Sequence, residues 1–172
     1  MRKFFFLMLS LAMVSSCSDG DLSIETIDFD SVAIDFCSAP NATTANLLFK
    51  INEDQVLILE LQSGVLNNGV VGETVITESA VPSRSQVTYR IFNDNVSDSY
   101  FCDVVPPSTP LVTEEVIAED GSVIIETSVN PDDNTQFLHK IQLSGISFIT
   151  GNDERITNLT ISEFGEVTTP IP

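Results

Sequence analysis

The sequence predicts an all-β fold, a single antiparallel β-sandwich of about nine strands. Val, Ile and Thr together make up 48 of the 172 residues, and β-branched side chains pack well on a pleated sheet but lose rotamer freedom in a helix. Turn signals recur about every 8 to 12 residues, with no helix-length periodic segment between them. A lipocalin-like β-barrel is the alternative, because similar short strands can also close into a barrel.

Hydrophobic alternation places four strands in the first half of the chain, at residues 47–51, 57–61, 74–78 and 87–91. Asn52-Glu53-Asp54 supplies the turn of a hairpin between the first two, and Asn67-Asn68-Gly69 marks the next turn. The polar stretch 93–99 is predicted to be a loop. The prolines at 106, 107 and 110 extend it into the longest linker, since proline cannot donate a strand hydrogen bond.

The second half continues the pattern, with predicted strands at 112–119, 122–129, 137–143, 146–148 and 156–161. Asp120-Gly121 is predicted to form a two-residue turn. Apolar residues move from odd positions, such as Ile141, to even ones, such as Phe148, which indicates a β-bulge at Ser144-Gly145. Residues 168–172 are expected to fray.

Length and charge narrow the class of protein. About 150 residues bury enough apolar surface to be stable as one domain, which we assign to residues 26–172. The chain has 25 acidic and 7 basic residues, a formal net charge of −18 at pH 7. Such a charge repels phosphate backbones, so we expect no nucleic-acid partner.

The first 17 residues have the order of a secretory signal. Arg2 and Lys3 precede an apolar run over 4–14, which is too short to span about 30 Å of hydrocarbon as a helix, and small residues lead to Cys17. The stretch Val14-Ser15-Ser16-Cys17 resembles the lipobox of bacterial lipoproteins. That resemblance implies a signal peptide over 1–16, acylation of Cys17, and a partner in the membrane through a lipid anchor. Residues 17–25 are then a lipidated tether.

Asp19 and Asp21 follow the cysteine closely. They resemble the export signal of Bacteroidota surface lipoproteins, although Gly20 interrupts the acidic pair. The stretch from Glu25 to Cys37 in a short acidic chain also resembles small lipoproteins of that group. The resemblance implies the bacterial outer membrane, with the domain exposed at the surface, and it implies no activity.

Cysteine usage predicts one disulfide. Lipidation of Cys17 leaves Cys37 and Cys102, an even pair in an oxidising compartment. Two cysteines so far apart, with a single histidine in the chain, have no recognisable metal-ligand spacing. We therefore predict a Cys37–Cys102 bond, no metal site and no cofactor.

Candidate modification and cation sites are few. Asp30-Ser31-Val32 resembles the short motif at which Bacteroidota envelope proteins are O-glycosylated, which makes Ser31 the candidate acceptor. Acidic pairs at Asp94 and Asp98, Asp132 and Asp133, and Asp153 and Glu154 offer oxygen ligands for Ca²⁺, but none has the spacing of an EF-hand loop. Solvated turns are the favoured interpretation of these pairs.

Residues for catalysis are scarce, and no catalytic residue is assigned. His139, the one imidazole, falls on an apolar strand face between Phe137 and Ile141, where a hydrogen-bonded core histidine is expected. No nucleophile elbow, zinc helix or phosphate loop is present in the sequence. We therefore expect no enzymatic activity and predict a non-enzymatic binding or interaction module. A small glycan hydrolase built on two carboxylates is the alternative.

Overall fold

The structure, a computed structural model, describes residues 29–149, 155–156 and 162–172. Within these ranges the regular secondary structure is almost entirely β, as the composition predicts. Its strands are β1 (Asn46–Asn52), β2 (Gln55–Leu61), β3 (Val75–Ala80), β4 (Ser85–Phe92), β5 (Val112–Val129), β6 (Gln136–Ile149), β7 (Arg155–Ile156) and β8 (Glu163–Pro170). One short helix, α1 (Ser99–Cys102), lies inside the stretch predicted as the longest linker.

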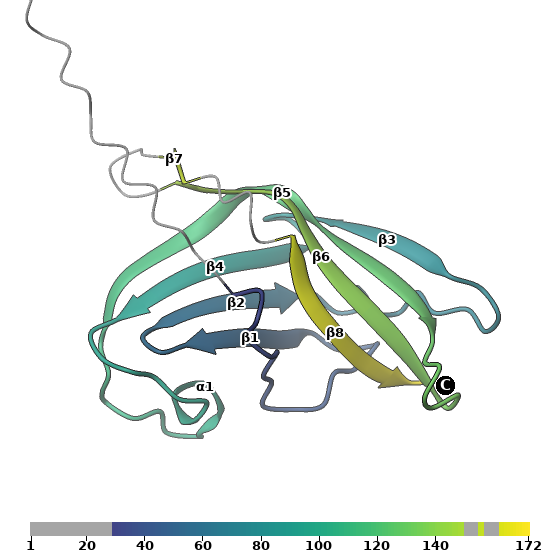
Figure 1. Cartoon of the computed structure of the whole chain (residues 1–172), viewed down its shortest axis with the longest axis horizontal. Coiled ribbons are helices and arrows are strands. Elements are labelled where there is room, and N and C mark those ends of the chain that lie inside the picture. Colours follow the sequence, from purple (N-terminus) through teal and green to yellow (C-terminus); the bar gives the residue numbers. More distant parts are fainter. Residues whose placement is uncertain (1–28, 150–154, 157–161) are drawn as a thin grey trace, which may run out of the picture.

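These strands form one antiparallel sheet that curls into a half-barrel (Figure 1). The order is β1-β2-β4-β5-β6-β7, with β3 also paired to β5 and β8 to β6. Neither the nine-strand sandwich nor the lipocalin-like barrel is confirmed. The described strands belong to one sheet instead of two, and no pairing among them closes it into a barrel.

The 18-residue strand β5 connects the two halves of the sheet. One of its edges pairs with β4 over its first residues and with β3 over its last ones, while β6 pairs along the other edge. Because β3 and β4 both run antiparallel to β5, they lie end to end, joined by the short kink 81–84. One half of the sheet is therefore β1-β2-β4, and the other is β3-β5-β6-β8.

The prediction of a turn at Asp120-Gly121 is wrong, because this dipeptide lies inside β5. The register with β6 shifts on each side of Asp120, so the dipeptide forms a bulge. Gly121 has a φ of 123°, a conformation that residues with a side chain rarely adopt, and a Cβ there would lie 2.9 Å from the carbonyl oxygen of Gly145. Glycine's tolerance of positive φ suggests a hairpin turn in the sequence. In the structure it allows a bend within a continuous strand.

The bulge predicted at Ser144-Gly145 is confirmed. Ser122 pairs with Ser144 and Asp120 with Ser147, so β6 holds one extra residue here. The kink 81–84 lies beside this point, since the Val81 N–H donates to the Gly121 carbonyl at 3.0 Å. Three neighbouring strands therefore bend along one line, and this line is the corner between the two halves of the sheet.

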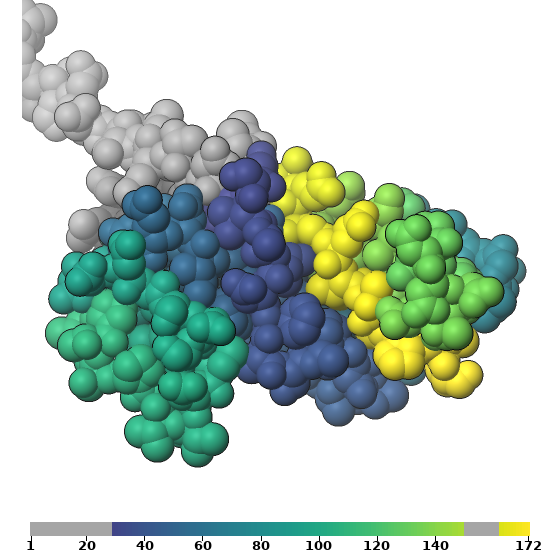
Figure 2. Space-filling view, turned by 60° about the horizontal axis from the view of Figure 1, so that its bottom comes forward, coloured from purple at the N-terminus to yellow at the C-terminus, as the bar shows by residue number. Residues whose placement is uncertain are grey.

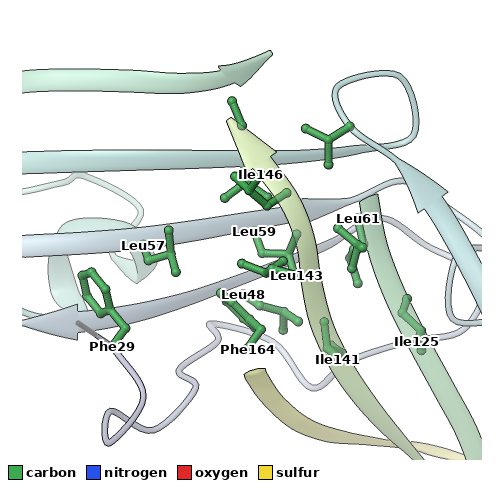
Figure 3. Packing of buried hydrophobic residues seen from close by; sticks show 14 of the residues in the cluster. Phe29, Leu48, Leu57, Leu59, Leu61, Ile125, Ile141, Leu143, Ile146 and Phe164 are labelled. Carbon is green, nitrogen blue, oxygen red and sulfur yellow. The ribbon is translucent and has the colours of Figure 1, made fainter. Parts of the chain in front are cut away.

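The inner face of the curled sheet holds the main hydrophobic core. Leu57 and Leu59 of β2 lie across the interior from Leu143 of β6 (Figure 3). Most of the side chains in this cluster are less than 3% exposed. Burial of each large aliphatic side chain contributes about 1.5–3 kcal/mol. The interior between the two halves is thus packed with the protein's own side chains.

The hairpin of β1 and β2 is confirmed, and β1 is buried on both faces at its centre. Leu48 pairs with Leu59 and joins the inner core, and Lys50 follows it on the same face. Phe49 lies on the opposite, outer face with Ile51. Because both faces of β1 are buried at its centre, the alternation of Leu47, Phe49 and Ile51 does not identify the inner one.

A second, smaller cluster covers part of the outer face of β1, β2 and β4. It contains Phe49, Ile58 and Phe92, with Tyr100 and Phe101 of α1 packed against them. The rings of Phe49 and Phe101 stack with centroids 4.6 Å apart. The segment that contains α1 therefore covers one end of this face.

The N-terminal segment, residues 29–37, is named here the strap. It runs between the half with β1 and the half with β8, coloured purple between blue and yellow in Figure 2. Phe29 is buried in the inner core, and Asp35 exchanges two backbone hydrogen bonds with Phe49, at 2.8 and 3.0 Å. Ile34 lies against Gly165 of β8. The strap thus occupies the open side of the half-barrel.

The expectation that residues 168–172 fray is wrong. Strand β8 pairs with β6 as far as Pro170, and the Ile171 N–H donates to the Thr135 carbonyl at 2.9 Å. Thr169 points into the interior and is 1% exposed. The strand predicted at 156–161 lies almost wholly outside the described residues.

Candidate functional site

The predicted lipid attachment lies outside the described residues. This holds for Cys17, for the signal peptide over 1–16 and for the tether over 17–25. In the part of the chain that is described, no helix is both long and apolar enough to span a membrane.

The predicted disulfide is present. Cys37, at the end of the strap, is bonded to Cys102 of α1, with their Cα atoms 5.0 Å apart. The bond joins the strap to the segment that covers the outer face. It therefore ties two elements, 65 residues apart in sequence, across the edge of β1.

Ser31, the predicted glycan acceptor, is exposed on the strap. On either side of it, Asp30 and Val32 line a cavity behind the strap. The hydroxyl thus lies on the outer side of a segment whose other side contacts the domain.

His139 is completely buried, and both of its ring nitrogens have partners. The hydroxyl of Thr127 donates to Asn68 Oδ1 at 2.9 Å, so it can only accept from His139. The proton therefore sits on Nδ1, which donates to Thr127 Oγ1 at 2.8 Å. Nε2 accepts from the hydroxyl of Thr169, also at 2.8 Å. The predicted core histidine is confirmed, and it belongs to a hydrogen-bond chain across β5, β6 and β8.

This chain continues to the edge of the sheet, because Asn68 Nδ2 donates to Thr77 Oγ1 of β3 at 2.5 Å. Burial lowers the pKa of His139 to about 4. The imidazole is thus neutral at pH 7, enclosed, and engaged on both sides. It offers a substrate neither a proton nor a lone pair.

Two of the described calcium candidates, Asp133 and Asp94, accept hydrogen bonds within their own turns. Asp133 Oδ1 accepts from the N–H of Thr135 at 3.0 Å and from its hydroxyl at 2.6 Å, and these bonds lower the pKa of Asp133. Asp94 Oδ1 accepts from the N–H of Asn95 at 2.8 Å. No three His, Cys, Asp or Glu side chains gather into a possible metal site within the described ranges. The pair Asp153 and Glu154 lies outside them.

Lys50, which sequence reasoning missed, is a buried cation. Its Nζ donates to the Phe29 carbonyl at 2.9 Å and lies 5.6 Å from the centre of the Phe164 ring. Desolvation lowers the pKa of Lys50, and the carboxylates of Asp30 and Glu163 oppose that shift. The side chain lines a cavity of about 340 Å³ between the strap and β8. The signal was available, because this lysine directly follows the apolar run Leu47-Leu48-Phe49.

A groove, named here the outer groove, lies at the uncovered end of the outer face. It has a volume of about 380 Å³ and collects residues of β1, β2, β4 and the kink 81–84. Charged, amide and apolar side chains share its walls, chiefly Leu47, Glu60, Gln62, Pro82, Arg84 and Gln86. Sequence reasoning missed it because the kink that forms one wall depends on how β5 bends.

Comparison of the chain with family models, with curated proteins and with solved structures gave no match.

Proposed function

We propose that the protein is an envelope lipoprotein, anchored by lipid on Cys17, that acts as a non-enzymatic binding or interaction module. Residues 1–16 would be removed as a signal peptide, 17–25 would form the tether, and 26–172 would form one β domain. Loss of Arg2 and Lys3 leaves 5 basic and 25 acidic residues, a formal charge of −20. Such a charge favours projection of the domain into water, away from an anionic membrane surface.

The observation that carries this proposal is the packed interior. A ligand-enclosing barrel keeps a cavity inside its sheet, whereas the inside of this sheet is filled by side chains such as Leu59, Ile141 and Phe164, each 0% exposed. His139, the one imidazole in the sequence, has both nitrogens bonded to threonine hydroxyls. We infer that ligand contacts lie on the outer surfaces and loops.

The same packing supports a finer assignment of architecture. A lipocalin-like barrel holds its ligand in a cavity between the strands, whereas the two halves of this sheet share one hydrophobic cluster. We therefore favour a sandwich-like arrangement of about nine strands, with the two halves as its layers and β5 as the strand common to both.

Metabolic labelling with a palmitate analogue tests the anchor. We expect label on the wild-type protein and on Cys102→Ala, and none on Cys17→Ala, which should leave the membrane fraction or remain unprocessed. Protease added to intact cells then shows on which face of the outer membrane the domain lies. Protection of the domain would assign it to the periplasmic face, and unchanged membrane partitioning of Cys17→Ala would contradict lipid anchoring.

The same cells can test modification of the strap. We expect Ser31→Ala to remove any glycan mass from the mature protein, because Ser31 is exposed. An intact mass that falls only by the oxygen atom lost in the substitution would remove Ser31 as the acceptor, without affecting the proposal on anchoring or binding.

A further inference from the structure

The outer groove lies where the outer face of β1, β2 and β4 is left bare. Leu47 pairs with Glu60, and Glu60 pairs with Gln86, so these three side chains form one row across the face. Along β1, Phe49 is 0% exposed under the segment with α1, whereas Leu47 is 39% exposed. One end of the face is therefore covered and the other is open to a ligand.

The wall formed by the kink is held in place by hydrogen bonds. The Arg84 N–H donates to the Ala80 carbonyl at 2.9 Å, and its own carbonyl accepts from the Gln62 N–H at 3.2 Å. Gln62 Nε2 also donates to the Ser83 carbonyl at 2.9 Å. A fixed backbone reduces the entropy that a ligand must overcome on binding. The base of the Arg84 side chain is thus preorganised beside the groove.

Arg84 is the unpaired cation among the basic side chains that the structure describes. Lys50 is buried under the strap, Arg90 pairs with Glu115, and Lys140 lies 3.7 Å from Glu166. Arg84 has no ion pair or side-chain hydrogen bond with any described residue, and the same holds for Glu60. As far as the described residues go, the groove therefore presents one positive and one negative group without a partner.

The register fixes how these two groups are spaced. Gln62 lies opposite Arg84, and Glu60 is two residues before Gln62 on the same face. Diagonal neighbours of this kind have Cα atoms about 7–8 Å apart. Between and beside them lie the apolar surfaces of Leu47 and Pro82 and the amides of Gln62 and Gln86.

Charge then selects among small ligands. An anion can pair with Arg84 but is repelled by the formal charge of −18, and a cation can pair with Glu60 but leaves Arg84 without a partner. A zwitterion has no net charge and can satisfy both groups. The volume of about 380 Å³ is near the lower end for ligand sites, which suits two or three amino-acid residues.

We propose that the outer groove binds a short zwitterionic peptide. Its carboxylate pairs with Arg84, its ammonium pairs with Glu60, and an apolar side chain lies over Leu47 and Pro82. The Nε2 groups of Gln62 and Gln86 donate to backbone carbonyls, so their Oε1 atoms are the ones placed to accept from the peptide N–H. This inference rests on the proposed binding function and specifies its ligand class.

The test is calorimetric titration of the protein, purified in detergent, with the dipeptide Ala-Leu. Binding should weaken roughly tenfold when the dipeptide is N-acetylated, and by a similar factor when it is C-amidated, since each change removes one charged partner. Arg84→Gln and Glu60→Gln should have the same effect. Arg90→Gln and Glu115→Gln are matched controls, because these charges lie on β4 and β5 outside the groove, and they should leave affinity unchanged.

Charge reversal gives the sharper result. Glu60→Lys and Arg84→Glu should each abolish binding. The double variant should restore binding, with the dipeptide lying in the opposite orientation in the groove. Equal affinity for the blocked dipeptides, or no binding by folded wild-type protein, would overturn the proposal. If glucuronate binds and its binding requires Arg84 but not Glu60, the ligand is an acidic sugar and the peptide proposal is wrong. Palmitate labelling and membrane fractionation are independent of these results, so failure here is distinct from failure of the proposed lipoprotein function.

Discussion

His139 and Thr127 form a buried hydrogen-bonded pair, with Nδ1 2.8 Å from Oγ1, that links β6 to β5. The other ring nitrogen accepts from Thr169, so the imidazole also links β6 to β8. Buried polar groups of this kind stabilise a fold only while every partner is satisfied. The pair therefore makes stability sensitive both to pH and to the loss of a single hydroxyl.

We predict that stability falls as the pH drops from about 6.5 to about 4. The pKa of His139 is lowered from 6.5 to about 4 in the folded protein, so in this window the unfolded chain binds a proton that the folded protein excludes. The contribution of neutral His139 to the unfolding free energy is complete above pH 6.5, the pKa in the unfolded chain. It is lost as the pH falls to about 4, the pKa in the folded protein. The loss amounts to about 3 kcal/mol.

Urea unfolding across this pH range measures the effect. The difference between wild type and His139→Gln isolates the histidine, because the carboxylates titrate in both proteins. Glutamine keeps a hydrogen-bonding group without the titration, and we expect it to cost about 1 kcal/mol at pH 7. A difference that does not vary between pH 4 and 6.5 would show that His139 is not held neutral.

We predict that Thr127→Val destabilises the protein by about 1–3 kcal/mol. Valine keeps the shape of the side chain but leaves His139 Nδ1–H and Asn68 Oδ1 without their partner. Thr168→Val is the matched control, because Thr168 lies half-buried on β8 and should cost little. Equal unfolding free energies for the two variants would contradict the assigned hydrogen-bond chain.

Much of the fold follows from local sequence, while its connections depend on contacts between distant residues. Alternation identifies the strand that contains Val87, and the change of face at Gly145 identifies the bulge. Gly121 looks like a hairpin turn because positive φ serves turns and bulges alike, and only pairing with β6 decides between them.

The candidate sites divide in the same way. The Cys37–Cys102 pair follows from counting, and the burial of His139 follows from its apolar neighbours. Lys50 and Arg84 were missed because residues distant in the sequence form their surroundings. The strap buries Lys50, and the kink 81–84 presents Arg84 beside β2. The hydropathy pattern of a single strand predicts neither contact.

We predict that Gly121→Ala costs about 2–4 kcal/mol. The φ of 123° is strained for any residue with a Cβ, and that atom would meet the Gly145 carbonyl oxygen at 2.9 Å and the Ile146 side chain at 2.8 Å. Gly64→Ala is the control, because Gly64 also has a positive φ, 81°, but a Cβ there meets nothing within 4 Å. It should cost about 1 kcal/mol. Similar losses for both variants would mean that the corner of the sheet tolerates the added atom.

Our last prediction concerns the Cys37–Cys102 bond. Thiol labelling of the unfolded, non-reduced protein should find no free thiol at these positions, and Cys37→Ser with Cys102→Ser should lower the unfolding free energy by about 2–4 kcal/mol, as expected for a loop of 65 residues. Local stability should fall most in the strap and in the segment with α1. Without the bond, backbone pairing at Asp35 and the stacking of Phe101 on Phe49 still hold these segments to β1. Hydrogen exchange should then be faster in residues 29–37 and 93–102, and unchanged around His139. Two labelled thiols in protein purified from cells without reductant would contradict the disulfide. Uniform acceleration of exchange across the sheet would show that the bond supports the whole fold instead of these two segments.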